Sequence, residues 1–110
     1  MKIVCKHLDA GEHWRTGQAG SSFSLASPNF NVTIKVASKG DIIEDSDSIC
    51  EEVSAILEGT FYVEAEDEAY ELSAGEGIVV PPGKDRAWRC TSNRGVLYRV
   101  LVTQPVKIAV

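Results

Sequence analysis

The sequence predicts an all-β fold, a sandwich or barrel of short strands. Runs rich in β-branched and aromatic residues alternate with turn residues along the chain, and helix signals are nearly absent. The segment Asn29–Ala37 shows the pattern best, because its apolar residues occupy every second position and therefore share one face of a strand. A chain of 110 residues is long enough for one compact domain, residues 1–110, and too short for two.

The expected strands follow one another with short connections. In chain order they are Lys2–Leu8, Asn29–Ala37, Ile49–Leu57, Thr60–Ala65, Ala69–Leu72, Ile78–Val80, Arg86–Thr91 and Val96–Val102. An acidic loop, Gly40–Ser48, precedes the third strand, and Glu66–Glu68 is expected to form a hairpin tip. Pro81 and Pro82 mark a strand end, because proline cannot donate to a β ladder. The stretch Cys50–Glu58 also has a helical spacing of apolar residues, and the resemblance described below decides in favour of a strand.

The net charge of the chain excludes some classes of partner. The net charge is -5 and no basic cluster exists, which argues against nucleic acid and anionic membranes as partners. No apolar run approaches the ~20 residues of a membrane span, and the N-terminus is a poor secretory signal, so a cytoplasmic location is expected.

Three cysteines without close pairs, Cys5, Cys50 and Cys90, predict reduced thiols in the core, with Cys90 the best candidate for a reactive one.

Two spaced motifs resemble the core of the cupin superfamily. Glu52 precedes Gly59 with six residues between them, as at the end of the first cupin motif, E-x6-G. Gly75 precedes Pro81 with five residues between them, and Gly83 completes the second motif, G-x5-P-x-G. The resemblance implies a small single-domain jelly-roll β-barrel of two antiparallel sheets, RmlC-like, that pairs into a homodimer. A weaker similarity links the chain to the cupins of ethanolamine utilisation.

The departures from the cupin motifs matter most for function. Asp45 and Asp47 stand where metal-binding cupins have the two histidines of the first motif, and Arg86 stands where the third histidine would be. Of the expected metal ligands only Glu52 is present. Glu52 and Arg86 are expected to point inward from adjacent strands, where the guanidinium can form a bidentate pair with the carboxylate and replace the metal.

The resulting hypothesis is a metal-free cupin-barrel protein, without a cofactor, that binds a small polar or anionic molecule in the barrel mouth. Its candidate ligand-binding residues are Glu52, Arg86, Trp88 and Asp47, because arginine binds carboxylates or phosphates and an indole stacks on a ring. Arg86 could equally make a purely structural ion pair. For Trp88 the position of a buried barrel residue is favoured over a place in the site.

Two alternatives remain at this point, and whether the protein is an enzyme stays open. The first is a cupin enzyme, an isomerase, lyase or dioxygenase-like protein, that uses a divalent metal ion held by Asp45, Asp47 and Glu52, or acid–base residues. Among acid–base residues His13 is the remaining candidate, since the tyrosines are expected to pack in strands. The second alternative is a non-catalytic assembly or accessory protein.

Overall fold

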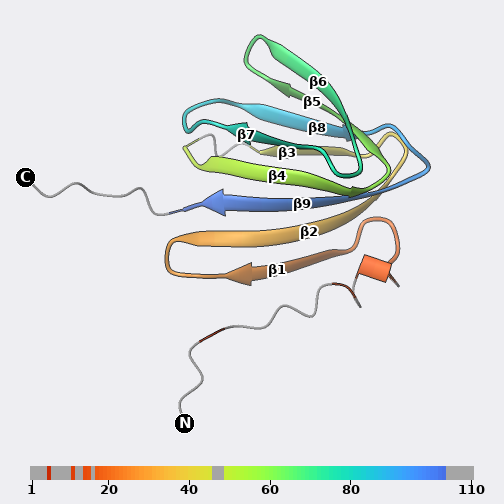
Figure 1. Cartoon of the computed structure of the whole chain (residues 1–110), viewed down its shortest axis with the longest axis horizontal. Coiled ribbons are helices and arrows are strands. Elements are labelled where there is room, and N and C mark those ends of the chain that lie inside the picture. The colour runs from red at the N-terminus through yellow and green to blue at the C-terminus, as the bar shows by residue number, and fades with distance from the viewer. Residues whose placement is uncertain (1–4, 6–10, 12–13, 16, 46–48, 104–110) are drawn as a thin grey trace, which may run out of the picture.

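Nine strands form two antiparallel sheets in the computed structural model, which describes residues 5, 11, 14–15, 17–45 and 49–103. The strands are β1 (Ser22–Ala26), β2 (Phe30–Ser38), β3 (Ile42–Asp45), β4 (Glu51–Glu58), β5 (Thr60–Ala65), β6 (Glu68–Ser73), β7 (Gly77–Val80), β8 (Arg86–Cys90) and β9 (Arg94–Val102). The first sheet has the order β1-β2-β9-β4-β7 and the second the order β3-β8-β5-β6 (Figure 1). The predicted all-β fold of two antiparallel sheets is therefore confirmed.

The main core lies between the two sheets. Because successive side chains of a strand point to opposite faces, each strand contributes every second residue to this inner layer. The buried residues of the layer are Ala37, Ile43, Ile56, Phe61, Val63, Leu72, Trp88, Cys90 and Leu97. Phe61 and Trp88 meet edge to face, with ring centroids 6.2 Å apart and an interplanar angle of 81°. These contacts hold the two sheets face to face and fix which side chains point inward.

The strand predictions from Asn29 onward are largely confirmed, including the preference for a strand over a helix at Cys50–Glu58. Two observed strands are absent from the prediction. β1 lies between the predicted strands Lys2–Leu8 and Asn29–Ala37, and β3 lies in Gly40–Ser48, the expected acidic loop. All four residues of β3 pair with β8, and Ile43, opposite Trp88, is buried in the core. The predicted strand Lys2–Leu8 lies outside the described residues, except for Cys5.

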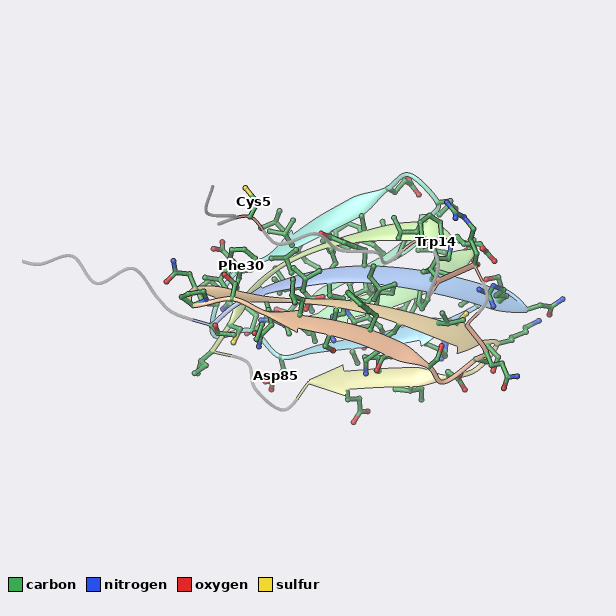
Figure 2. The ribbon with its side chains drawn as sticks, turned by 90° about the horizontal axis from the view of Figure 1, so that it is seen from below. Cys5, Trp14, Phe30 and Asp85 are labelled. Atoms are coloured by element: carbon green, nitrogen blue, oxygen red, sulfur yellow. The ribbon has the colours of Figure 1, made fainter. Side chains whose placement is uncertain are left out.

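The alternating apolar residues of Asn29–Ala37 lie on the outer side of the first sheet, whereas Ala37 itself belongs to the inner layer. Ile34 and Val36 of β2 form a second, smaller cluster with Val96, and Trp14 from the segment before β1 packs against it (Figure 2). The register places this face opposite to Glu52, since Glu52 pairs with Leu101 and Leu101 with Asn31. The apolar stripe of β2 therefore belongs to the outer face of the first sheet and not to the layer between the sheets.

The cysteines are free thiols, as expected from their spacing. Cys50 and Cys90 are buried, but Cys5 is exposed, so its assignment to the core was wrong. Among the described residues, no helix is long and apolar enough to cross a membrane.

Candidate functional site

Glu52 lies on the inner face of β4 and is completely buried. In the first sheet its register partners are Leu101 of β9 and Val80 of β7, which places the carboxylate between two apolar neighbours. An ionised carboxylate in such a place loses its hydration, and this loss costs several kcal/mol unless charged partners replace the water. The charge state of Glu52 therefore depends on which positively charged side chains contact it.

Arg99 of β9 is the main partner of Glu52. Its Nε lies 2.7 Å from Oε2 of Glu52 and its Nη2 lies 2.7 Å from Oε1, which is a bidentate ion pair between two buried side chains. The hydroxyl of Ser54, two residues along the same strand, donates a further hydrogen bond to Oε2. Both carboxylate oxygens of Glu52 are thus satisfied from within the first sheet.

Arg86 of β8 approaches Glu52 from the second sheet. Its Nη1 lies 3.4 Å from Oε1 of Glu52, and both side chains are fully buried. The rest of the guanidinium holds the loop between β7 and β8. Nε and Nη2 donate to the carbonyl of Lys84 at 3.0 and 2.7 Å, and Nη2 also donates to the carbonyl of Pro81 at 3.3 Å. Arg86 therefore joins Glu52 to the backbone of this loop.

These contacts determine the protonation state of Glu52. Burial raises the pKa of the carboxyl, but the hydrogen bond and charge of Arg99, the hydrogen bond of Ser54 and the charge of Arg86 lower it by more. The pKa of Glu52 consequently lies below its ordinary value, and the side chain is a carboxylate at neutral pH. Two guanidinium groups then face one buried carboxylate.

The ion pair predicted between Glu52 and Arg86 is present, but two details of the prediction were wrong. The two residues face each other from opposite sheets, not from adjacent strands. The bidentate contact is made by Arg99, which the sequence analysis did not single out. The alternation of the last strand carried a signal, because Arg99 occupies the same face as Leu97 and Leu101. A charged residue on an apolar face requires a partner.

Trp88 and Cys90 are core residues. Trp88 is fully buried between the sheets, next to Phe61, and its Nε1 has no hydrogen-bond partner among the described residues. Cys90 is also buried, and its Sγ lies 3.3 Å from the carbonyl oxygen of Ser92. Trp88 therefore occupies the core position that the sequence allowed as an alternative to a ligand-binding role. The thiol of Cys90, the predicted candidate for a reactive cysteine, is shielded from solvent.

The alternative metal site of Asp45, Asp47 and Glu52 lies only partly within the described residues. Asp45 is the last residue of β3 and pairs in register with Arg86 of β8. Asp47 lies outside the described residues, as does His13, the predicted acid–base candidate. Within the described part of the chain, no group of three or more histidine, cysteine, aspartate or glutamate side chains could hold a metal ion.

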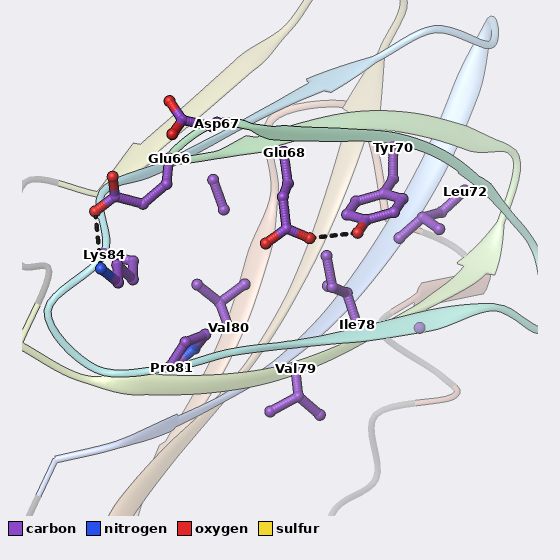
Figure 3. A pocket seen from close by; sticks show the side chains of 12 residues that line it. Glu66, Asp67, Glu68, Tyr70, Leu72, Ile78, Val79, Val80, Pro81 and Lys84 are labelled. Carbon is purple, nitrogen blue, oxygen red and sulfur yellow. Dashed lines mark hydrogen bonds and ion pairs between the residues drawn. The ribbon is translucent and has the colours of Figure 1, made fainter.

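A pocket of about 560 Å³ lies at the open side of the two sheets, between β6 of the second sheet and β7 of the first (Figure 3). Leu72 of β6 and Ile78 and Val80 of β7 provide its apolar side chains, and Figure 3 shows Val79 pointing the other way. Its polar side chains are those of Glu66, Asp67, Glu68, Tyr70 and Lys84.

The pocket adjoins the buried ion network without including it. Glu52, Arg86 and Trp88 do not line it, but Val80, the register partner of Glu52, does. Pro81 and Lys84 line it as well, and their carbonyls are the ones that Arg86 holds. The buried network thus supports one end of the pocket through the loop between β7 and β8.

Solved structures with the same arrangement of strands identify the fold. A conserved Streptococcus pyogenes protein of unknown function superposes with a TM-score of 0.70 and 24% identity, over 79% of this chain and 75% of that one. A cupin superfamily protein of Desulfitobacterium hafniense gives a TM-score of 0.67 and 15% identity, over 78% and 81% of the two chains. The chain has the cupin fold. The fold implied by the two sequence motifs is thereby confirmed.

Cupin structures include enzymes as well as proteins of unknown function. The DMSP lyase DddQ of Ruegeria pomeroyi superposes with a TM-score of 0.66 and 17% identity, over 80% of this chain but 49% of that one. No protein-family model and no curated relative matches the chain. At these identities the likeness establishes the fold alone.

A metal ion bound in the manner of the histidine cupins does not fit the residues at Glu52. The carboxylate would be the one ligand retained from that set, and both of its oxygens already accept hydrogen bonds from Arg99. Arg86 and Arg99 also place two permanent positive charges within 3.4 Å of the carboxylate, which would repel a cation. The two guanidinium groups supply the positive charge that a metal ion would otherwise supply to Glu52.

Proposed function

We propose that this chain is a metal-independent cupin that binds a small polar organic molecule in the pocket between β6 and β7. The observation that carries the proposal is the double use of Glu52 and Arg86. Glu52 is neutralised internally by Arg99 and Arg86, and Arg86 at the same time holds the loop that forms one end of the pocket. A position that resembles a metal site thus acts as a support for a binding pocket.

The position of the ligand differs from the one expected from sequence. Arg86 directs its guanidinium to Glu52 and to two backbone carbonyls, so its donors already have partners. Trp88 is buried in the core, where it offers no surface for stacking. The pocket between β6 and β7 instead combines apolar walls with polar groups, and its volume lies in the usual range of ligand sites, roughly 300–1,000 Å³.

Tyr70, one of the polar groups in the pocket, is not suited to act as a general base. A general base has to accept a proton near neutral pH. Tyr70 donates a hydrogen bond to Glu68, and this bond together with the negative charge of Glu68 raises the pKa of the phenol above its ordinary value. Tyr70 is therefore a poor base, and it serves as a neutral hydroxyl and a ring surface.

Ligand binding by metal-stripped protein tests the proposal. We expect chelator-treated protein, with far less than one metal ion per chain by elemental analysis, to bind members of a library of small polar compounds. Methyl NMR signals of Leu72, Ile78 and Val80 should shift on binding, because these residues line the pocket. The methyl signals of Val53, on the outer face of the first sheet, should not. Pocket signals that respond only after a divalent cation is restored would contradict the proposal.

Two further expectations from the sequence stay predictions. The first is a homodimer, with which the outer face of the first sheet is compatible, because Val53 and Val79 are 46% and 60% exposed there. The second is a cytoplasmic location, which rests on the cysteine spacing and on the N-terminal sequence.

A further inference from the structure

The polar side chains of the pocket between β6 and β7 carry an excess of negative charge. Glu66, Asp67 and Glu68 are acidic, and Lys84 is the one basic residue among those that line the pocket. Lys84 is paired with Glu66, with Nζ 3.3 Å from Oε1. After this pairing, Asp67 and Glu68 have no basic partner in the lining, and Figure 3 shows that of these two only Glu68 extends toward β7.

Glu68 is the acidic residue best placed to meet a ligand. It is the first residue of β6 and lies in the same register row as Ala65 and Arg86, on the inner side of the second sheet. Figure 3 shows its side chain extending toward β7, with Oε1 joined to the hydroxyl of Tyr70. Its Oε2 has no hydrogen-bond partner among the described residues, so one carboxylate oxygen is available to a donor.

Tyr70 and the apolar residues complete the site. Tyr70 follows Glu68 by two residues, so both side chains point to the same face of β6, and the tyrosine residue is 44% exposed. An exposed aromatic ring next to a carboxylate attracts an organic cation through its negative face. Ile78 and Val80 lie across the pocket on β7, where they can contact an apolar ligand body.

We propose that the ligand of this pocket is a small organic cation, a protonated amine with an apolar body. The ammonium donates to Oε2 of Glu68 beside the ring of Tyr70, and the apolar part lies against Leu72, Ile78 and Val80. This inference rests on the proposed function and specifies its ligand class. It reverses the sign expected from sequence, since the arginine that suggested an anion is buried beneath the pocket and paired with Glu52.

Three probes of similar size and different charge test the inference: phenethylamine, phenethyl alcohol and phenylacetate. Each is titrated at pH 7 and low salt into the full-length protein, and the methyl NMR signals of Leu72, Ile78 and Val80 are followed. We expect phenethylamine to bind most tightly and phenylacetate most weakly. Added salt should weaken the amine alone, because exposed charges are screened within about 10 Å at 0.1 M ionic strength.

Glu68→Gln and Glu71→Gln form a matched pair of variants. The glutamine amide oxygen in Glu68→Gln can still accept the hydrogen bond of Tyr70, so the substitution removes the charge and keeps the local contact. Glu71 lies on the same strand, is exposed and does not line the pocket. Glu68→Gln should weaken amine binding about fivefold, the scale of a half-exposed charge pair, whereas Glu71→Gln should leave it within about twofold.

The outcomes separate the two proposals. Equal or tighter binding of the alcohol or the carboxylate would overturn the cationic ligand and leave the pocket standing as a binding site. Equal effects of the two glutamine variants would overturn the role of Glu68. Absence of methyl shifts with all three probes would overturn the pocket itself, and with it the proposed function.

Discussion

Replacing Arg99 with methionine is expected to lower the free energy of unfolding by about 3–5 kcal/mol at neutral pH, the usual cost of leaving one charge of a buried pair without its partner. Methionine fills a similar volume but cannot donate to Glu52. Arg86 alone, at 3.4 Å and committed to two carbonyls, cannot replace the bidentate contact. Urea unfolding followed by circular dichroism measures the loss.

Two further variants separate the charge effect from packing. Arg89→Met makes the same substitution at an exposed position on β8, where Arg89 stacks over the ring of Tyr62 at 5.2 Å, and should cost less than about 1 kcal/mol. In the double variant Glu52→Gln/Arg99→Met the carboxylate is removed together with the guanidinium that pairs with it, so its loss of stability should be smaller than the sum of the losses of Glu52→Gln and Arg99→Met. If the loss of stability in the double variant equals the sum of the losses of Glu52→Gln and Arg99→Met, then Glu52 and Arg99 do not form the pair described here.

The effect of Arg99→Met should depend on pH in a direction fixed by Glu52. In the wild type the folded-state pKa of Glu52 is lowered, so the stability it contributes is present above the unfolded-state pKa and is lost as pH falls through the folded-state pKa. Without Arg99 its hydrogen bond and charge no longer lower the pKa of Glu52, so this pKa is higher in the variant than in the wild type. The deficit of the variant is therefore largest at neutral pH and should shrink as pH falls from the folded-state pKa of Glu52 in the variant toward the lower one in the wild type.

Gly59→Ala is the second change with a large expected effect, about 3 kcal/mol or more, from backbone strain and a steric clash together. Gly59 ends the turn after β4 with φ +76°, a left-handed conformation that disfavours a side chain. A Cβ there would also lie well inside 3.0 Å of both the carbonyl oxygen of Arg94 and Oγ of Ser92, closer than real Cβ atoms come. Ser92 cannot easily move, because it accepts from the Thr60 amide and donates to Arg94.

Gly75 provides the matched control. It has φ +92°, but a Cβ at this position meets nothing within 4 Å. Gly75→Ala should therefore cost only the conformational part, about 1–2 kcal/mol. Thermal and urea unfolding of the two variants measure the difference, and equal losses would show that the close approach of the β8–β9 turn to Gly59 does not constrain the fold.

The fold could be predicted because the residues that mark its turns form short patterns in the sequence. Gly59 and Gly75 lie in turns that need positive φ, and their spacing from Glu52 and Pro81 sets the strand lengths. β1 and β3 were missed because each is short and lies in a segment rich in serine, glycine or acidic residues. Both are edge strands, which gain their stability from pairing with β2 and β8 and not from their own propensity.

The site could be predicted only in part, because its parts come from distant strands. The motif spacing identified Glu52 and Arg86, but the register of β9 brings Arg99 into the same layer, and no motif marks it. The pocket depends on how far β6 and β7 stand apart at the edges of two different sheets. Such a separation is set by packing across the whole core and leaves no local pattern in the sequence.

The protonation of Glu52 tests the central claim most directly. The side-chain carboxyl carbon of Glu52 can be followed by carbon-detected NMR during a pH titration of the chelator-treated wild-type protein. Internal neutralisation by Arg99 and Arg86 predicts a pKa below the usual value of a glutamate, with no change when a divalent cation is added. A raised pKa in the metal-free protein that falls when the cation is added would show that Glu52 is a metal ligand, and would contradict the account.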